Sequence, residues 1–173
     1  QYAAKGFDNI DIDSLVERSF ANFYEGIREE EIDSSNLMAA KEKIEVDPVY
    51  AKVAARVLLD KCYRETLGVN ARKKNLERTH SAWFKKYIQR GVSLERLSPK
   101  LLSFDLERLA KELCLERDLQ FDYLGLQTLY DRYFIHEKGK RLETPQIFWM
   151  RVAMGLSLNE GERKNEWAIE FYH

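Results

Sequence analysis

Thiol and imidazole side chains are the groups in this sequence best suited to catalysis or metal binding. The chain has two cysteines, Cys62 and Cys114, and three histidines, His80, His136 and His173. They form neither an HExxH motif nor the paired Cys/His spacing that holds zinc. Each cysteine lies among apolar residues in a helical pattern, which favours a small buried side chain in a reducing compartment over a reactive thiol. The sequence therefore predicts no metal site and no catalytic residue.

A basic run near position 70, formed by Arg72, Lys73 and Lys74, is open to two interpretations. It is either a nucleic-acid contact or a solvated loop. The chain carries 28 Lys and Arg against 29 Asp and Glu, a formal net charge of -1, so no large basic field attracts nucleic acid. This balance favours the solvated loop and predicts no nucleic-acid partner. The sequence also shows no glycine-rich phosphate loop and nothing resembling a catalytic triad.

The composition, 45% apolar and 12% aromatic, indicates packed structure. A chain of 173 residues suits one ordinary domain or two small ones. Its apolar runs are far shorter than the roughly 20 residues of a membrane span, and its first residues lack the apolar core of a secretory signal. We therefore expect a cytoplasmic protein without a membrane partner. The missing initial Met and the helical pattern at His173 indicate a piece of a longer chain.

Helical periodicity dominates the sequence and predicts an all-α fold. Apolar residues recur every three or four positions, and capping residues or glycines stand at the breaks. Residues 1–68 are expected to form one small bundle, because each of their three helices has a single apolar face. The expected limits of these helices are Asp13 to Gly26, residues 29–44, and Asp47-Pro48 to Gly68.

Residues 69–173 are expected to form a second helical subdomain, because the polar stretch "GVNARKKNLER" at 68–78 lacks periodicity and indicates a linker. A fourth helix around 83–88 is expected to end at Gly91. Further helices follow the start signals Ser98-Pro99 and Ser103 or Asp105, span Tyr123 to Tyr133, and carry Trp167 to Tyr172.

One segment departs from the helical pattern, the stretch "RYFIHEKGKRLE" at 132–143. Aromatic and branched residues precede Lys138-Gly139, and glycine readily supplies the positive φ of a tight turn. We expect a short β-hairpin near residues 133–143. Because an isolated hairpin is marginal in water, it must pack on neighbouring helices.

The next stretch, "LETPQIFWMRVAMGL" at 142–156, predicts a helix with two buried faces. Thr144 is expected to cap its first amides, and Pro145 fits the first helical position because its missing N–H has no partner there. Phe148 belongs to one apolar stripe and Trp149 widens it, so both side chains are expected to be buried.

The second half of the sequence resembles a known protein family in the order of its segments. These are "LYDRYFI", a polar turn, "LETPQIFWMRVAMGL" and "WAIEFY", preceded by "SFDLERLAKELCLERDLQFDYLGLQTL". Together they resemble the N-terminal helical domain of the large (alpha) subunit of class I ribonucleotide reductase, over roughly Leu97 to His173. In that family a RYL-type strand, a hairpin and an ETP helix with an Arg-Val-Ala segment precede the catalytic barrel. The corresponding residues here are Arg132 to Phe134, Glu143 to Pro145 and Arg151 to Ala153.

The earlier stretches "FYEGIREEEID" and "DPVYAKVAARVLLDKCYRE" resemble the helical half of an ATP-cone, the regulatory nucleotide-binding module of many reductases. The family's V-x-K-R-D-G phosphate-binding segment is not present in this sequence. Glu29 and Asp33 stand where the family has Thr and His, and Arg64 stands where it has a phosphate-facing Lys. The resemblance implies an incomplete cone over 1–68 with weak or lost binding of the effectors ATP and dATP. Arg64 is the one candidate nucleotide-binding residue.

The resemblance further implies that the complete protein is a ribonucleoside-diphosphate reductase, whose catalytic cysteines lie in the barrel. Cys62 and Cys114 match none of them, so this chain is expected to be a non-catalytic regulatory and scaffold part without a cofactor. Its implied partners are the barrel of the same chain and a radical-generating small subunit, in a homodimeric enzyme. Arg151 is then expected to be a structural anchor that pairs with Glu143 or Glu160. The alternative is a stand-alone helical protein-interaction module without enzyme activity.

Overall fold

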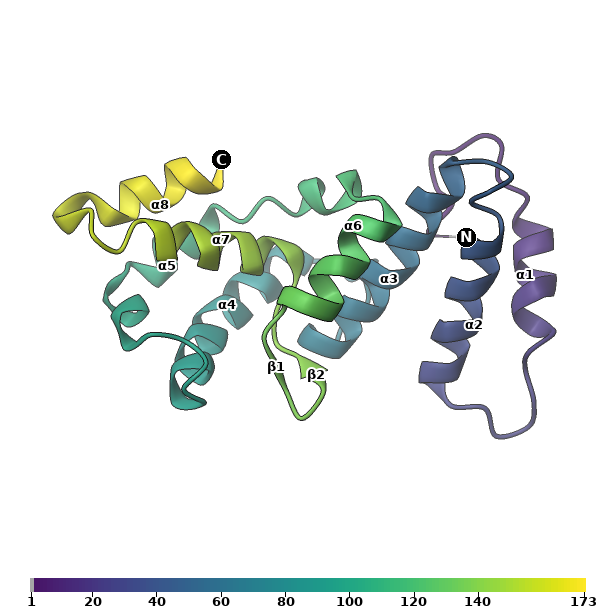
Figure 1. The fold of residues 1–173 in the computed structure, drawn as a ribbon, viewed down its shortest axis with the longest axis horizontal. Helices are drawn as coiled ribbons and strands as arrows, with labels where there is room; N and C mark the ends of the chain where they lie inside the picture. The colour runs from purple at the N-terminus through teal and green to yellow at the C-terminus, as the bar shows by residue number, and fades with distance from the viewer. Residues whose placement is uncertain (1) are drawn as a thin grey trace.

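Helices make up nearly all of the regular structure in residues 2–173, the part of the chain that the computed structural model describes (Figure 1). The all-α prediction is confirmed. The α-helices are α1 (Ile12–Phe20), α2 (Glu29–Glu42), α3 (Val49–Leu67), α4 (Leu76–Ser93), α5 (Leu106–Lys111), α6 (Tyr123–Thr128), α7 (Pro145–Leu156) and α8 (Lys164–Tyr172). Single turns connect them: η1 (Pro99–Ser103), η2 (Leu115–Gln120), the π-helical η3 (Leu129–Tyr133) and η4 (Gly161–Arg163).

Local signals set most of the helix limits as expected. Gly68 ends α3 in the left-handed region, with φ 69°. Asp47 accepts a hydrogen bond from the Val49 amide at the start of α3 (2.9 Å). The first helix begins earlier than predicted, because Asp11 rather than Asp13 caps α1 by accepting from the Ser14 amide. It is nevertheless shorter than predicted, because it ends at Phe20 and does not reach Gly26.

Gly91 does not end α4, contrary to the sequence prediction. It is buried inside the helix, which continues to Ser93. A Cβ atom at Gly91 would lie 2.5 Å from Leu97 Cδ1. The glycine therefore allows the segment after α4 to fold back closely against the helix.

The predicted hairpin is confirmed. Strands β1 (His136–Glu137) and β2 (Lys140–Arg141) pair antiparallel, with His136 opposite Arg141. Lys138 and Gly139 both have positive φ, 50° and 83°, as a two-residue type I′ turn requires. The hairpin packs on α3, where the Thr66 hydroxyl donates to the Arg141 carbonyl (3.3 Å).

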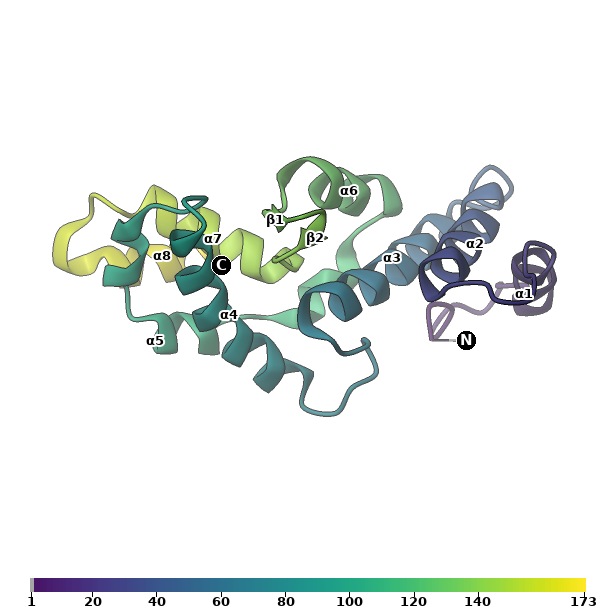
Figure 2. The same cartoon turned by 90° about the horizontal axis from the view of Figure 1, so that it is seen from below.

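Three apolar clusters hold the chain together, and α3 and α7 each contribute to two of them. Figure 2 shows α3 running from the α1 and α2 end of the molecule toward α6 and the hairpin. One cluster joins α2 to α3, a second joins α3 to α6, η3 and Phe148 of α7, and the largest joins α4, α5, α7 and α8. Within residues 2–173, no helix is long and apolar enough to cross a membrane.

The expected second buried face of α7 is not covered in this chain. Phe148 is 6% exposed, whereas Trp149 is 42% and Leu156 66% exposed, so the prediction that Trp149 is buried is wrong. Thr144 makes no side-chain capping bond, and its buried Oγ1 has no partner among the described residues. The start of α7 therefore depends on Pro145 and on packing rather than on the predicted cap.

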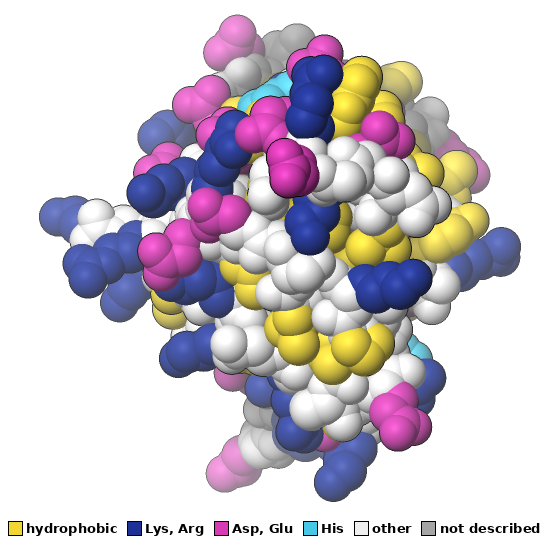
Figure 3. Space-filling model, turned by 90° about the vertical axis from the view of Figure 1, so that its left-hand side faces the viewer, with side chains coloured by type: hydrophobic (Ala, Val, Ile, Leu, Met, Phe, Trp, Pro, Cys, Tyr) yellow, Lys and Arg dark blue, Asp and Glu magenta, His cyan; other side chains and the backbone are white. Residues whose placement is uncertain are grey.

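The α8 end of the molecule shows charges of both signs. Seen from this side in Figure 3, Lys and Arg side chains alternate with Asp and Glu around small apolar areas. One such pair joins Arg108 of α5 to Glu166 of α8 at 2.8 Å. Exposed pairs of this kind contribute little to stability, typically about 0.2–1 kcal/mol.

Candidate functional site

Arg64, the residue predicted to bind nucleotide, lies on α3 and is surrounded by three carboxylates. Its Nη1 donates to Glu29 (2.6 Å), its Nη2 to Asp33 (2.6 Å) and its Nε to Asp60 (3.0 Å). The hydrogen bond to Asp33 contributes most to raising the pKa of the guanidinium. One positive and three negative formal charges meet here, so the cluster carries an excess of negative charge.

The periodicity of two neighbouring helices produces this arrangement. Glu29 and Asp33 are one turn apart on α2, and Asp60 and Arg64 are one turn apart on α3, so each pair projects from one helix face. Asp60 also accepts from the Ala71 amide (2.8 Å), which fixes the start of the linker beside the cluster. Sequence reasoning identified Glu29, Asp33 and Arg64 but did not identify Asp60.

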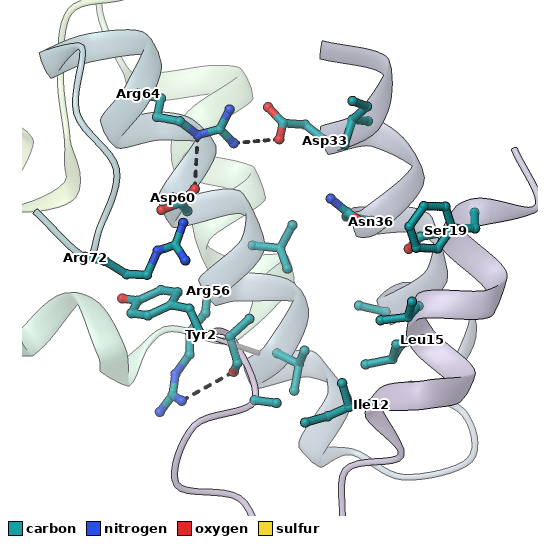
Figure 4. Close-up of a pocket in the computed structure, with 18 of the residues that line it drawn as sticks. Tyr2, Ile12, Leu15, Ser19, Asp33, Asn36, Arg56, Asp60, Arg64 and Arg72 are labelled. Carbon is teal, nitrogen blue, oxygen red and sulfur yellow. Dashed lines mark hydrogen bonds and ion pairs between the residues drawn. The ribbon is translucent and has the colours of Figure 1, made fainter. Parts of the chain in front are cut away.

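A groove of about 420 Å³ lies between α1, α2 and α3, with the Arg64 cluster at one end (Figure 4). Ile12 and Leu15 of α1 face it from one side, and Arg56 and Arg72 lie on the other. Its size is in the range of small-molecule sites, roughly 300–1,000 Å³. A phosphate group that approached Arg64 would have to displace a carboxylate from it.

Arg56 joins the first described residues to α3. Its Nη1 donates to the carbonyl oxygens of Lys5 (2.6 Å) and Ala3 (3.4 Å), and its guanidinium lies 4.3 Å from the centroid of the Phe7 ring. These contacts give Arg56 a role within the fold, and it is not a free cation for the groove.

Glu143 forms a second polar cluster, which lies in the centre of the molecule. Its side chain is fully buried and accepts hydrogen bonds from the Tyr87 hydroxyl and from the Ile135 amide (2.6 Å). Arg151 donates to both carboxylate oxygens, at 2.5 and 3.3 Å. Two partners were predicted for Arg151, Glu143 or Glu160, and Glu143 is the one observed. Burial raises the pKa of Tyr87, so its hydroxyl stays protonated and remains a donor.

A third cluster, centred on Asp118 of η2, was not predicted. Asp118 is buried and accepts from the Tyr63 hydroxyl on α3 and from Gln146 Nε2 on α7 (2.6 Å). Gln146 Oε1 accepts from the Tyr172 hydroxyl on α8 (2.5 Å), which accepts from the Cys114 amide (2.8 Å). This buried network, which we call the Asp118 network, links α3, η2, α7 and α8. Its one sequence signal is that Asp118 lies in the stretch "SFDLERLAKELCLERDLQFDYLGLQTL", which resembles the family.

The Asp118 network predicts a stability that depends on pH. Burial raises the pKa of Asp118 to about 7, although its two hydrogen bonds favour the charged form. The unfolded chain loses this proton near pH 4. Between about pH 4 and 7 the folded state therefore holds more protons, so the free energy of unfolding falls as pH rises, by at most about 1.4 kcal/mol per pH unit.

Urea unfolding at a series of pH values measures this effect as the difference between the parent and Asp118→Asn. The parent is expected to lose stability relative to the variant from about pH 4 to 7. Asp13→Asn, at an exposed position in α1, is the matched control and should follow the parent. A constant difference between the parent and Asp118→Asn across this range would contradict the prediction.

Cys62 does not lie in a setting suited to thiolate chemistry. Cys62 is fully buried, and burial raises the pKa of its thiol well above the ordinary value. Cys114 is half-buried, and both thiols are free. His80 is also buried, which lowers the pKa of its imidazole to about 4. Within residues 2–173, no group of three or more His, Cys, Asp or Glu side chains is placed to hold a metal ion.

Comparison with known proteins adds independent information. Residues 119–173 match the family model described as ribonucleotide reductase, all-alpha domain. Over 173 residues the chain is 49% identical to the ribonucleoside-diphosphate reductase subunit alpha of Chlamydia pneumoniae, an alignment that covers 99% of this chain and 16% of the relative.

Two further relatives extend the comparison. The subunit alpha of Chlamydia trachomatis is 54% identical over 160 residues, which cover 92% of this chain and 15% of the relative. That of Helicobacter pylori is 36% identical over 152 residues, which cover 87% of this chain and 18% of the relative. The chain thus spans less than a fifth of the length of these relatives.

Proposed function

This chain belongs to the large-subunit family of ribonucleotide reductases, and we propose that the complete protein reduces ribonucleoside diphosphates to deoxyribonucleotides. The chain itself supplies the helical scaffold beside the catalytic part. Within this proposal, residues 1–68 are the helical part of an incomplete ATP-cone, and residues 69–173 are the all-alpha domain. The complete enzyme works in the cytoplasm as a homodimer with a radical-generating small subunit.

The placement of the two thiols is the observation that supports a non-catalytic role for this chain. A reductase of this family needs cysteines that reach the substrate and exchange electrons. Cys62 is a buried residue of α3, and its sulfur lies 3.5 Å from the carbonyl oxygen of Glu143. Cys114 is half-buried at the N-cap of η2, where its backbone amide donates to the Tyr172 hydroxyl. The reacting cysteines therefore belong to other parts of the complete protein.

The uncovered face of α7 supports a scaffold role. Trp149 and Leu156 are exposed on a helix whose other large apolar side chains are buried or partly buried. Large exposed apolar side chains of this kind favour contact with another surface. We propose that the catalytic barrel of the same polypeptide covers this face. The Glu143 and Asp118 clusters would hold α7 in place for that contact.

Replacing both cysteines tests the non-catalytic role. In the full-length protein, Cys62→Ala with Cys114→Ala is expected to retain turnover of ribonucleoside diphosphates, measured as deoxyribonucleotide formed. The loss should be confined to stability, because Cys62 is fully buried and its replacement leaves a small cavity. A double variant with an unchanged melting temperature and no turnover would overturn the assignment.

We further propose that the cone-like part has lost effector binding at Arg64. The three carboxylates around Arg64 occupy the donors that a phosphate would use, and they repel a triphosphate at close range. One charged hydrogen bond contributes only about 1.5–3 kcal/mol. Millimolar affinity already requires about 4 kcal/mol. Arg64 alone therefore does not support tight binding of ATP or dATP.

Titration calorimetry of this chain with ATP and dATP tests the loss of effector binding. At micromolar protein concentration, neither nucleotide is expected to bind with a dissociation constant below about 10 μM, and Arg64→Ala should not change any weaker binding. The matched variant is Glu29→Thr with Asp33→His, which restores the residue types of the family. A gain of nucleotide binding in this variant would support the proposal that the two carboxylates prevent binding. A dissociation constant below about 10 μM for the parent, weakened by Arg64→Ala, would show a working effector site and contradict the proposal.

A further inference from the structure

A basic groove lies where the linker meets the start of α4, separate from the Arg64 cluster. Its volume is about 430 Å³, and Lys73, Lys74, Arg78 and Lys86 line it together with Trp83. Figure 2 shows the connection between α3 and α4 as a loop at the edge of the molecule, next to the first turns of α4.

The backbone brings these cations together from two elements. Asn75 adopts the left-handed conformation, with φ 62°, between the lysine pair of the linker and the start of α4. Arg78 and Lys86 are eight residues apart on α4, so they share a face over roughly 12 Å. The lysines of the basic run thus line the same groove as two cations that the sequence analysis did not connect with them.

The charges of the groove are not compensated by the described part of the chain. None of its four cations forms an ion pair within residues 2–173, and no Asp or Glu lines it. Some arginines elsewhere, such as Arg64 and Arg151, are paired with carboxylates. The groove is therefore a local positive site in a chain whose formal net charge is -1.

Trp83 gives the groove a fixed wall. Its indole Nε1 donates to the carbonyl of Leu142, the residue that follows β2 (2.9 Å), so the ring is held in place rather than free to close over the cations. Small-molecule sites are usually preformed, as this wall is, and the volume of the groove fits their usual range of roughly 300–1,000 Å³.

We propose that this groove binds a compact polyanion that carries two or more linked phosphate groups. The span of its cations on α4, roughly 12 Å, suits an oligophosphate better than an extended polymer. Arg78 can bind a phosphate through two parallel hydrogen bonds, and the lysines add point charges. The near-zero net charge provides no wide basic surface for nucleic acid. This site goes beyond the proposed scaffold role and does not depend on it.

Calorimetric titration of this chain with inorganic tripolyphosphate at low salt tests the proposal. We expect a dissociation constant on the order of 0.1 mM, which rises with added salt. Lys74→Ala with Arg78→Ala should weaken binding about tenfold or more. Lys100→Ala with Lys111→Ala, two exposed cations outside the groove, is the matched control with the same change in net charge and should bind as the parent does. Arg64→Ala should also bind as the parent does, which separates this site from the cone-like part.

Several results would overturn the proposal. One is the absence of tripolyphosphate binding up to about 5 mM. Another is equal weakening of binding in the groove variant and in its control, which would indicate non-specific charge attraction. Tighter binding of an acidic peptide or of single-stranded DNA than of tripolyphosphate would show that the occupant is of another class. Circular dichroism of each variant verifies that it is folded. If ATP binds no tighter than tripolyphosphate, and the same variant weakens its binding, the groove recognises the phosphates alone.

Discussion

Replacing Glu143 by Ala is expected to destabilise the chain by about 3–5 kcal/mol, because it leaves a charge and two donors without their partner. The side chain of Arg151 is only 19% exposed and has no other carboxylate beside it among the described residues. The Tyr87 hydroxyl and the Ile135 amide would also lose their acceptor. Unsatisfied buried donors each add to the loss.

Urea unfolding monitored by circular dichroism measures this effect. Glu160→Ala removes a carboxylate from an exposed turn and is the matched control, with an expected change within about 0.5 kcal/mol. Glu143→Gln keeps the shape and one acceptor, so its smaller loss would isolate the contribution of charge. A loss below about 1 kcal/mol for Glu143→Ala would mean that water or another residue replaces the carboxylate.

Truncation of Phe148 to Ala is expected to cost about 3–5 kcal/mol, the range for a buried aromatic whose site does not collapse. Phe148 is 6% exposed, and its ring centroid lies 5.6 Å from that of Phe134. It joins α7 to the cluster of α3 and α6, so its loss affects the contact between the two parts of the molecule.

The neighbouring residue provides the matched control for Phe148. Trp149→Ala removes a larger side chain from the same helix, but that side chain is 42% exposed. Its expected cost in this chain is below about 2 kcal/mol. Equal losses for the two variants would show that the Trp149 face is buried in solution, for example by self-association, which a concentration series would reveal. In the full-length protein, Trp149→Ala should cost more if the barrel covers this face.

The helix and turn limits were largely predictable because they depend on neighbouring residues. Gly68 ends α3, and Lys138-Gly139 turns the hairpin, since each needs only a backbone conformation that its own residue type favours. Pro145 begins α7 for the same local reason. The pairing of Arg151 with Glu143 was anticipated as one of two choices, because both partners are near in sequence.

The clusters in the candidate sites were less predictable, because their members are far apart in the chain. Tyr63 and Asp118 are 55 positions apart, and no local pattern connects them. The resemblance to a known family pointed to Glu29, Asp33 and Arg64, but it did not point to Asp60. Which donor each carboxylate holds depends on how α2 and α3 pack.

The sequence by itself determined the all-α class, most element limits, the hairpin turn and the family. These follow from side-chain periodicity and from residue-specific backbone preferences, which act over a few positions. Tertiary structure alone decided that Gly91 is a packing position, that Trp149 is exposed and that Asp118 is buried. It also decided that Arg64 is paired with carboxylates, whereas the four cations of the basic groove form no ion pair among the described residues. Burial and charge compensation depend on which distant segments pack together, and local sequence patterns do not specify that.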